Sequence, residues 1–140
     1  MIPLYEKFFN KVKYKNKFLI HEHHADRVGL HYDIRIEHNG KLESWACRYI
    51  PDLIKGTKKK ILIILQPPHD LDWFDFEGEI KDTYGKGRVK IWDKGNVNKI
   101  KWGDKHKTIE FNGTKLKGVH HIIPYSGGKK TQFLMFKAKS

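Results

Sequence analysis

The sequence has little cysteine and no long apolar run. Cys47 is the one cysteine among 140 residues, so neither a disulfide within the chain nor a zinc site of several cysteines can form. The longest aliphatic run, residues 61–65, is far below the roughly 20 residues of a membrane-spanning helix, and no apolar signal segment follows Met1. We therefore expect a soluble, cytoplasmic protein without a membrane partner, in which histidine and carboxylate side chains hold any metal ion.

Acidic residues are also few. The chain has 16 Asp and Glu against 28 Lys and Arg, a formal net charge of +12. This balance favours polyanionic partners, nucleic acid above all. The 39% of hydrophobic residues, with 13% aromatics, can form a core, which excludes a disordered basic tail. A chain of this length has room for one domain.

One hairpin is predicted clearly. Residues 30–37 alternate apolar and polar side chains, the period of a β-strand with one apolar face. Asn39-Gly40 follows and favours a two-residue type I′ turn, because both positions tolerate positive φ. Residues 41–49 then return antiparallel. Near the start of the chain, the four-residue spacing of Leu4, Phe8 and Val12 predicts a short helix.

The rest of the chain is also rich in strand signals. Residues 61–65 are expected to form a buried strand that Pro67-Pro68 ends, after a solvated, lysine-rich loop over residues 55–60. Further strands are expected at 88–92, 99–102, 107–111, 119–123 and 132–136. These elements predict a mainly β, single-domain antiparallel β-barrel of about eight strands over residues 18–140. The short N-terminal helix lies in an extension over residues 1–17, and loops flank the barrel.

The polar face of the strand at 30–37 is the best candidate site. His31, Asp33 and Arg35 are spaced by two residues, so their side chains leave the same face of the strand. The Cα atoms of successive members are about 6 to 7 Å apart. An imidazole and a carboxylate at this spacing can bind one metal ion, and a guanidinium beside them can bind a phosphate oxygen. The alternative is an ordinary solvent-facing strand surface, which is common for antiparallel sheets.

Other histidines could complete the site. His21, His23 and His24 lie upstream, and His69 follows a rigid Pro-Pro pair. His120 and His121 are adjacent, so in a strand they point to opposite faces and are expected to be structural.

These residues belong to an ordered series of motifs. In chain order the motifs are His23-His24-Ala25, residues 30–37, Asn39-Gly40, Ser44-Trp45-Ala46, His69-Asp70-Leu71, Asp75-Phe76-Glu77-Gly78, Tyr84-Gly85-Lys86-Gly87, Ile91-Trp92-Asp93 and residues 133–137. The series resembles the 3′-phosphoesterase domain of bacterial and archaeal DNA ligase D over most of residues 18–139. No single motif would suffice, but the order is specific.

The resemblance implies an antiparallel barrel with a manganese-dependent site that trims DNA 3′ ends. Such domains remove a 3′-terminal ribonucleotide and then hydrolyse the remaining 3′-phosphate to leave a 3′-hydroxyl. The ligands implied for Mn²⁺, or for another divalent ion such as Co²⁺ or Zn²⁺, are His23, His31 and Asp33. Arg35 would bind the phosphate, and His69 would contact it from the opposite side, as a transition-state contact or a proton donor. Tyr84 is a further candidate for nucleic-acid contact.

The sequence departs from the family pattern at several places. By alignment Tyr49 occupies the position of a family lysine after the Ser-Trp-Ala strand. A two-residue turn pairs His31 with Arg48, so Arg48 is our candidate for the missing catalytic and phosphate-binding cation. Lys60 corresponds to a basic family residue before the strand at 61. Family motifs that support ribonucleotide removal have no counterpart in residues 1–17, so 3′-phosphatase activity is the firmer expectation.

The expected function is therefore metal-dependent healing of DNA 3′ ends by a monomeric enzyme. A separate DNA ligase or end-binding protein is the expected protein partner. Two alternatives remain open at this stage: a non-catalytic, basic nucleic-acid-binding barrel, and a metallophosphoesterase that acts on RNA or nucleotides.

Overall fold

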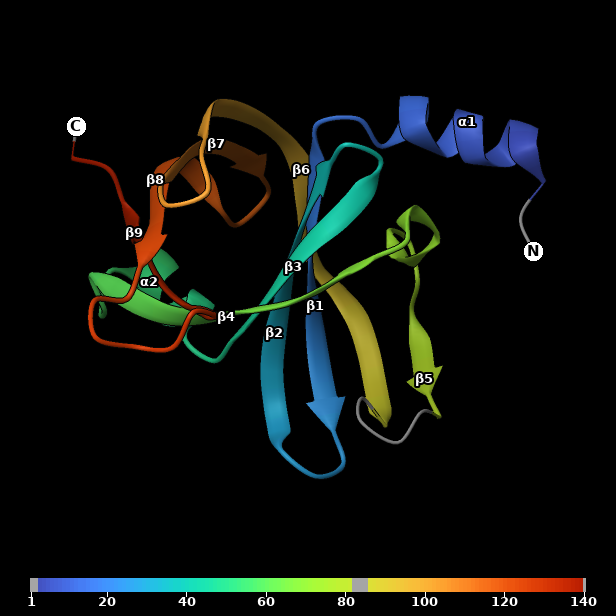
Figure 1. Cartoon of the computed structure of the whole chain (residues 1–140). Coiled ribbons are helices and arrows are strands. Elements are labelled where there is room, and N and C mark those ends of the chain that lie inside the picture. The colour runs from blue at the N-terminus through green and yellow to red at the C-terminus, as the bar shows by residue number, and fades with distance from the viewer. Residues whose placement is uncertain (1–2, 82–85, 140) are drawn as a thin grey trace.

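The computed structural model describes residues 3–81 and 86–139 (Figure 1). The helical elements are α1 (Leu4–Lys13), α2 (Ile50–Lys55) and the short 3₁₀ helix η1 (Leu71–Trp73). The strands are β1 (Lys17–Ala25), β2 (Gly29–His38), β3 (Lys41–Cys47), β4 (Lys60–His69), β5 (Gly78–Ile80), β6 (Gly87–Trp102), β7 (Lys107–Gly113), β8 (Lys117–Pro124) and β9 (Gln132–Lys137). No helix of the described residues is long and apolar enough to cross a membrane.

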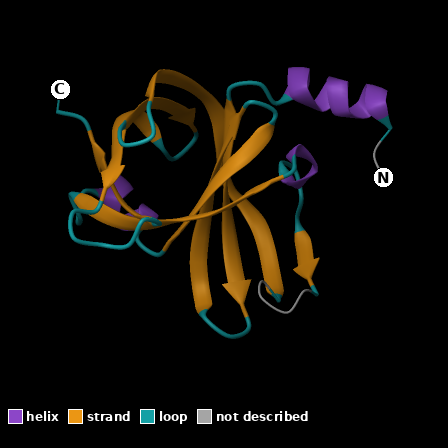
Figure 2. Ribbon diagram, in the orientation of Figure 1, coloured by secondary structure: helices purple, strands orange, loops and turns teal. Residues whose placement is uncertain are grey.

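Eight of the described strands form a closed antiparallel barrel (Figure 2). Their order is β1-β2-β3-β4-β9-β8-β7-β6, and pairing of β1 with β6 closes the ring. The short strand β5 lies outside the ring and pairs with β6. The expected barrel of about eight strands with a short N-terminal helix is confirmed.

The hairpin of β2 and β3 has the expected register. Asn39 and Gly40 both have positive φ, 53° and 81°, and His38 pairs with Lys41. Because the turn has two residues, Asp33 lies opposite Ala46 and Arg35 lies opposite Ser44. Trp45 and Cys47 face the barrel interior, where they pack with residues such as Ile34.

Apolar side chains gather on both sides of the barrel wall. The interior holds the main core, which includes Phe18, Ile34, Trp45, Ile63 and Phe111. A smaller cluster covers part of the outer face and consists of Tyr14, Leu19, Leu42, Leu71 and Phe74. The outer cluster takes side chains from β1, β3 and the segment around η1, so one part of the outer wall is buried as well.

Two strand predictions were wrong in their boundaries. The separate strands expected at 88–92 and 99–102 are one strand, β6, of 16 residues. Its length lets it pair with β1 in one half and with β7 in the other, which is how it closes the barrel. Turn-forming residues such as Gly95 lie inside β6 because neighbouring backbone packs against them there.

The strand expected at 61–65 was also wrong in two respects. Its burial alternates, with Ile61 and Ile63 inside and Leu62 and Ile64 partly exposed, so it is not buried on both faces. It also continues beyond Pro67-Pro68 to His69. The prolines are tolerated because the pairing of β3 with β4 shifts register there, and a β-bulge needs no ladder hydrogen bond from its extra residue.

This bulge decides where His69 points. Ser44 pairs with Gln66, whereas Leu42 pairs with His69, so β4 holds two residues where β3 holds one. Side chains alternate along a strand, and one extra residue exchanges the faces beyond it. The bulge therefore places His69 on the outer face of the barrel, the same face as Arg35 and Ser44.

Candidate metal and phosphate site

The polar face of β2 is buried, which overturns the alternative of an ordinary solvent-facing surface. Asp33 is 6% exposed and Arg35 is 4% exposed, although both point away from the barrel interior. The outer apolar cluster and the segment around η1 cover this part of the wall. A buried carboxylate and guanidinium need partners, because removing either charge from water is costly.

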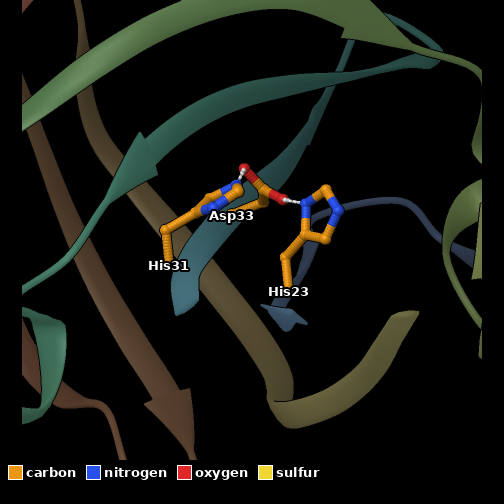
Figure 3. Close-up of side chains that lie close together, drawn as sticks. All are labelled: His23, His31 and Asp33. Carbon is orange, nitrogen blue, oxygen red and sulfur yellow. Dashed lines mark hydrogen bonds and ion pairs between the residues drawn. The ribbon is translucent and has the colours of Figure 1, made fainter. Parts of the chain in front are cut away.

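The side chains of His23, His31 and Asp33 form a cluster suited to a metal ion (Figure 3). His23 on β1 pairs in register with His31 on β2, and Asp33 lies two residues further along β2. His23 Nδ1 lies 3.2 Å from Asp33 Oδ2, and His31 Nε2 lies 3.5 Å from Asp33 Oδ1. One ligand atom from each residue lies within 4.8 Å of the others.

The donor set fits a divalent transition metal. Two imidazoles and one carboxylate suit Mn²⁺, Zn²⁺ or Co²⁺. Ligand atoms about 2.1 Å from one ion lie at most about 4.2 Å apart, so small side-chain rotations would bring the three donors into range. His31 Nδ1 is also buried and has no hydrogen-bond partner among the described residues, which leaves this ring without a second anchor.

Electrostatics keep the carboxylate of Asp33 ionised. Burial alone would raise the pKa of Asp33, but hydrogen bonds to His23 and His31 and the charge of Arg35 together hold this pKa far below its usual range. An ionised carboxylate is the form that binds a cation. The cluster therefore needs no proton loss from Asp33 to accept a metal ion near neutral pH.

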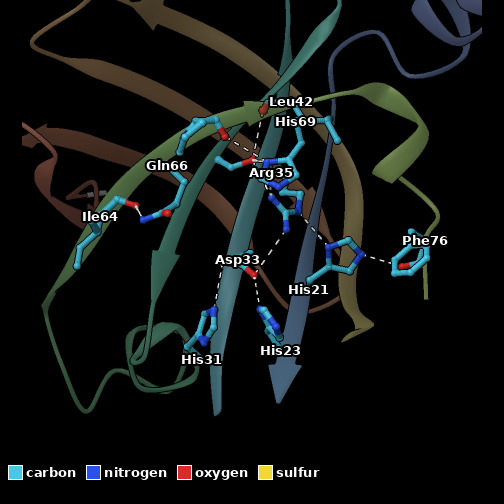
Figure 4. Close-up of polar contacts among 12 residues, drawn as sticks. His21, His23, His31, Asp33, Arg35, Leu42, Ile64, Gln66, His69 and Phe76 are labelled. Carbon is cyan, nitrogen blue, oxygen red and sulfur yellow. Dashed lines mark hydrogen bonds and ion pairs between the residues drawn. The ribbon is translucent and has the colours of Figure 1, made fainter. Parts of the chain in front are cut away.

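Arg35 is anchored on three sides (Figure 4). Its Nε donates to His21 Nδ1 at 3.0 Å, its Nη1 donates to Ser44 Oγ at 2.9 Å, and Nη1 also lies 3.2 Å from His69 Nδ1. Its Nη2 lies 3.6 Å from Asp33 Oδ2. The guanidinium is thus held next to the His-His-Asp cluster, with Nη2 on the side of Asp33.

The structure separates the three upstream histidines. His21 is fully buried, and because Nδ1 accepts from Arg35, its Nε2 carries the proton donated to Phe76 O at 2.8 Å. Burial and the nearby Arg35 charge lower the pKa of His21 to about 4, so the ring is neutral. His24 is exposed and pairs with Glu22. His23 is therefore the upstream histidine that lies beside His31 and Asp33.

His69 and Trp73 border the site on the side where Arg35 lies. The Trp73 ring lies 5.8 Å from the Arg35 guanidinium carbon and meets the His69 ring edge to face at 5.3 Å. Burial and the charge of Arg35 lower the pKa of His69, so its imidazole is neutral near pH 7. His69 Nδ1 lies 3.2 Å both from Arg35 Nη1, a donor, and from the main-chain oxygen of Pro67, an acceptor, so these two contacts favour opposite tautomers of the ring.

The other candidates lie further out. Arg48 donates to the main-chain oxygens of Leu30 and Val28 at 2.9 and 2.8 Å, and it lines a hollow with His31 and Tyr49. Lys60 lies four residues before Ile64 on β4, about 13 Å along the strand, and its Nζ lies 5.1 Å from the Phe136 ring centroid. Tyr84 lies outside the described residues.

Sequence reasoning missed three residues that orient this site. Ser44 and Trp73 contact Arg35 directly, and His21 was considered as a metal ligand instead of as a partner of Arg35. The position of Ser44 could have been found, since it pairs with Arg35 once the hairpin turn is known. Trp73 gives no such signal, because its contact depends on how the segment after β4 folds back.

The chain is similar to known proteins of non-homologous end joining. The multifunctional non-homologous end joining protein LigD of Pseudomonas aeruginosa is 35% identical over 130 residues, which cover 88% of this chain and 15% of that protein. The LigD proteins of Mycobacterium tuberculosis and Mycolicibacterium smegmatis are 37% and 34% identical over 120 and 125 residues. The chain spans about a sixth of the length of these relatives.

A family model that matches most of the chain shows the family to which the chain belongs. A model of the DNA ligase D 3′-phosphoesterase domain matches residues 21–124, which contain the His-His-Asp cluster together with Arg35 and His69. The matched region begins in β1 and ends in β8, so it includes most strands of the barrel. The chain belongs to the DNA ligase D 3′-phosphoesterase family.

Proposed function

We propose that the protein is a metal-dependent phosphoesterase that heals DNA 3′ ends. It would remove a 3′-phosphate to leave a 3′-hydroxyl that a separate DNA ligase can join, and removal of a 3′-terminal ribonucleotide is the second activity to be tested. The observation that carries the proposal is the buried Arg35 guanidinium, fixed beside the cluster of His23, His31 and Asp33. The arrangement supports the proposal because a guanidinium beside such donors could bind a phosphate oxygen while the donors hold a metal ion.

The cluster and Arg35 would act on the phosphate in different ways. His23, His31 and Asp33 would hold the ion, with Mn²⁺ foremost, and a bound divalent ion would polarise the phosphoryl group and lower the pKa of water. Arg35 would donate to a phosphate oxygen and stabilise charge that develops in the transition state. Because its side chain is already anchored by His21 and Ser44, little conformational freedom is lost when phosphate binds.

His69 acts as a hydrogen-bond donor in this proposal. Its lowered pKa makes it neutral near pH 7. In the tautomer in which Nδ1 accepts from Arg35, it would offer an Nε2–H bond to the phosphate instead of transferring a proton as an imidazolium. Arg48 uses two of its five N–H donors on main-chain oxygens and could offer another to the phosphate. Lys60 and the other surface cations would attract the DNA backbone from a distance.

The test is phosphate release from a DNA primer with a 3′-phosphate. Purified protein with Mn²⁺ is expected to convert this end to a 3′-hydroxyl, and treatment with a chelator is expected to stop the reaction. Asp33→Asn and His23→Ala should each lower kcat/KM by about 100-fold or more, because each removes a metal ligand. His24→Ala is the matched control, since His24 is exposed and pairs with Glu22, and it should keep normal turnover.

The outcomes separate this function from the two alternatives. Equal turnover by the Asp33→Asn variant and the unaltered protein would contradict the proposal. Salt-sensitive DNA binding without product under any divalent metal would identify a binding protein. Faster turnover of RNA ends or free nucleotides than of DNA ends would identify another class of phosphoesterase. A second primer with a 3′-terminal ribonucleotide measures the removal of that nucleotide separately.

A further inference from the structure

An apolar hollow of about 320 Å³ opens beside the metal cluster. Its lining residues are Val28, His31, Ala46, Cys47, Arg48, Tyr49, Leu62 and Ile64. His31 lines this hollow and also belongs to the cluster with His23 and Asp33. A group bound in the hollow would therefore touch the same histidine as an ion in the cluster.

The strand register makes the hollow and the cluster one continuous surface. Asp33 pairs with Ala46, and Ala46 pairs with Ile64 on the next strand. Paired residues of neighbouring strands lie about 5 Å apart and share a face of the sheet, so this row leads directly from the metal ligands to the floor of the hollow. Figure 4 shows Ile64 and Gln66 on the β4 side of Asp33.

Two neighbouring positions around the cluster are filled by buried side chains. Towards β6, His23 pairs with Val89, which is 1% exposed. Towards the outer apolar cluster, Arg35 and Trp73 fill the space. Towards β4, in contrast, Leu62 and Ile64 are 37% and 36% exposed. A phosphate on the cluster therefore has room for its attached group on the β3–β4 side.

We propose that this hollow binds the terminal nucleoside of the DNA strand whose 3′-phosphate lies at the cluster. The inference rests on the proposed function and extends it to the substrate. Ala46, Leu62 and Ile64 form an aliphatic floor for the flat face of a base. Tyr49, which is 45% exposed, supplies an aromatic ring of the kind on which bases stack. The volume is at the lower end of small-ligand sites, which suits one nucleoside.

The chemistry of the lining predicts whether the hollow can recognise one base over another. Arg48 is held flat against the β1–β2 turn by its bonds to Leu30 O and Val28 O, so it forms a wall of the hollow. The floor is aliphatic and offers no hydrogen-bond donor or acceptor for a base edge. Specific base recognition needs such donors and acceptors. The floor itself should therefore not distinguish the four bases, whereas an end that lacks a base would lose the stacking contact.

The experiment compares two 3′-phosphate primers of the same sequence. One carries the fluorescent base 2-aminopurine at its 3′ end, and the other carries an abasic residue there. Turnover is measured with Mn²⁺, and fluorescence is measured during binding without metal. The variant is Leu62→Ser with Ile64→Ser, and the matched control is Ile100→Ser, an exposed isoleucine on β6. Thermal melting of each variant verifies that it folds.

The unaltered protein should turn over the base-bearing end about tenfold faster in kcat/KM than the abasic end, because base stacking is worth about this factor or more. The double variant should lose most of that preference through a raised KM, with kcat changed less than about twofold. Ile100→Ser should keep the preference. Binding should change the 2-aminopurine fluorescence in the unaltered protein and not in the double variant.

Two results would overturn the inference. Equal kcat/KM for the base-bearing and abasic ends in the unaltered protein would show that the base contributes nothing, without reference to any variant. An unchanged preference in the folded double variant would place the base elsewhere. If no primer released phosphate, the proposed function would fail, and the fluorescence change would still decide whether a terminal base occupies the hollow.

Discussion

Arg35 is a buried charge whose partners hold its guanidinium in a fixed orientation. Its guanidinium is surrounded by His21, Ser44, His69 and Asp33, so most of its hydrogen-bonding capacity is met inside the protein. An unpaired buried cation would destabilise the fold strongly. The partners therefore have two roles, since they stabilise the charge and also set the direction of the remaining N–H groups.

His21 is expected to act on catalysis through Arg35. His21→Ala removes the acceptor for Arg35 Nε, so we expect kcat/KM for 3′-phosphate release to fall about 100-fold through misplacement of the guanidinium. Mn²⁺ affinity should change less than about threefold, because His21 is not in the metal cluster. His24→Ala is the control and should alter neither quantity. Loss of Mn²⁺ affinity in His21→Ala, as large as in His23→Ala, would contradict this role.

At the scale of elements, Asp93 links two parts of the barrel. Its carboxylate on β6 accepts main-chain N–H bonds from Thr114, Lys115 and Leu116, at 2.8, 3.1 and 2.7 Å, in the connection between β7 and β8. It belongs to one of the family motifs in the sequence, yet its contacts are structural. A motif residue can therefore stabilise a loop instead of taking part in chemistry.

Asp93→Ala is expected to lower the free energy of unfolding by about 3 kcal/mol or more. The substitution leaves several main-chain N–H groups without their acceptor, and the one of Leu116 is buried. Urea denaturation measures the change. Asp104→Ala, at an exposed position in another loop, should change the stability by less than about 0.5 kcal/mol. Similar values for the two variants would contradict the structural role of Asp93.

The helix α1 contributes little to the barrel. None of its residues is buried, and it extends away from the barrel wall in Figure 1. Tyr14, directly after it, is buried, stacks on Phe74 at 4.4 Å between ring centroids and donates to Asp75 at 2.8 Å. The outer apolar cluster thus begins at Tyr14 and not in the helix.

Removal of residues 1–13 should therefore lower the Tm by less than about 3 °C. Tyr14→Ala should lower it by about 10 °C, because the loss of a buried aromatic ring costs roughly 3 kcal/mol. Differential scanning calorimetry distinguishes the two cases. A larger loss in the truncated protein than in Tyr14→Ala would show that α1 packs on the barrel in solution.

For the whole molecule, histidine burial predicts an acid-sensitive fold. Burial is the first cause that lowers the pKa of the buried His21 and His120 and of the partly buried His38 and His69. A histidine with a folded pKa below its unfolded value of about 6.5 stabilises the fold above that value, and this contribution is lost as the pH falls. For His21 the loss extends from about pH 6.5 towards its folded pKa of about 4.

The urea midpoint of the metal-free protein should therefore be lower at pH 5 than at pH 7. His21 alone accounts for about 1 to 2 kcal/mol of this difference. The comparison needs a chelator and constant ionic strength, because metal binding and screening of the +12 charge also change stability. An equal or higher midpoint at pH 5 would contradict the neutral state of His21 and of the other histidines with lowered pKa.

Local patterns in the sequence predicted much of this molecule. The alternation in β2 placed His31, Asp33 and Arg35 on one face, and Asn39-Gly40 predicted the register of the hairpin. Both depend on neighbours within a few residues, so the sequence alone was sufficient. The barrel class followed in the same way from many short strands with turn residues between them.

Tertiary structure alone decided the rest of the site. The choice of His23 over His21 depends on contacts with Asp33 and Arg35 from β2. The direction of His69 depends on a bulge at Pro67-Pro68, and the burial of Arg35 depends on an outer apolar cluster drawn from distant segments. The sequence by itself determined which residues share a strand face. Closure of the barrel and packing on its outer wall decided which of them meet, because such contacts join side chains that are far apart along the chain.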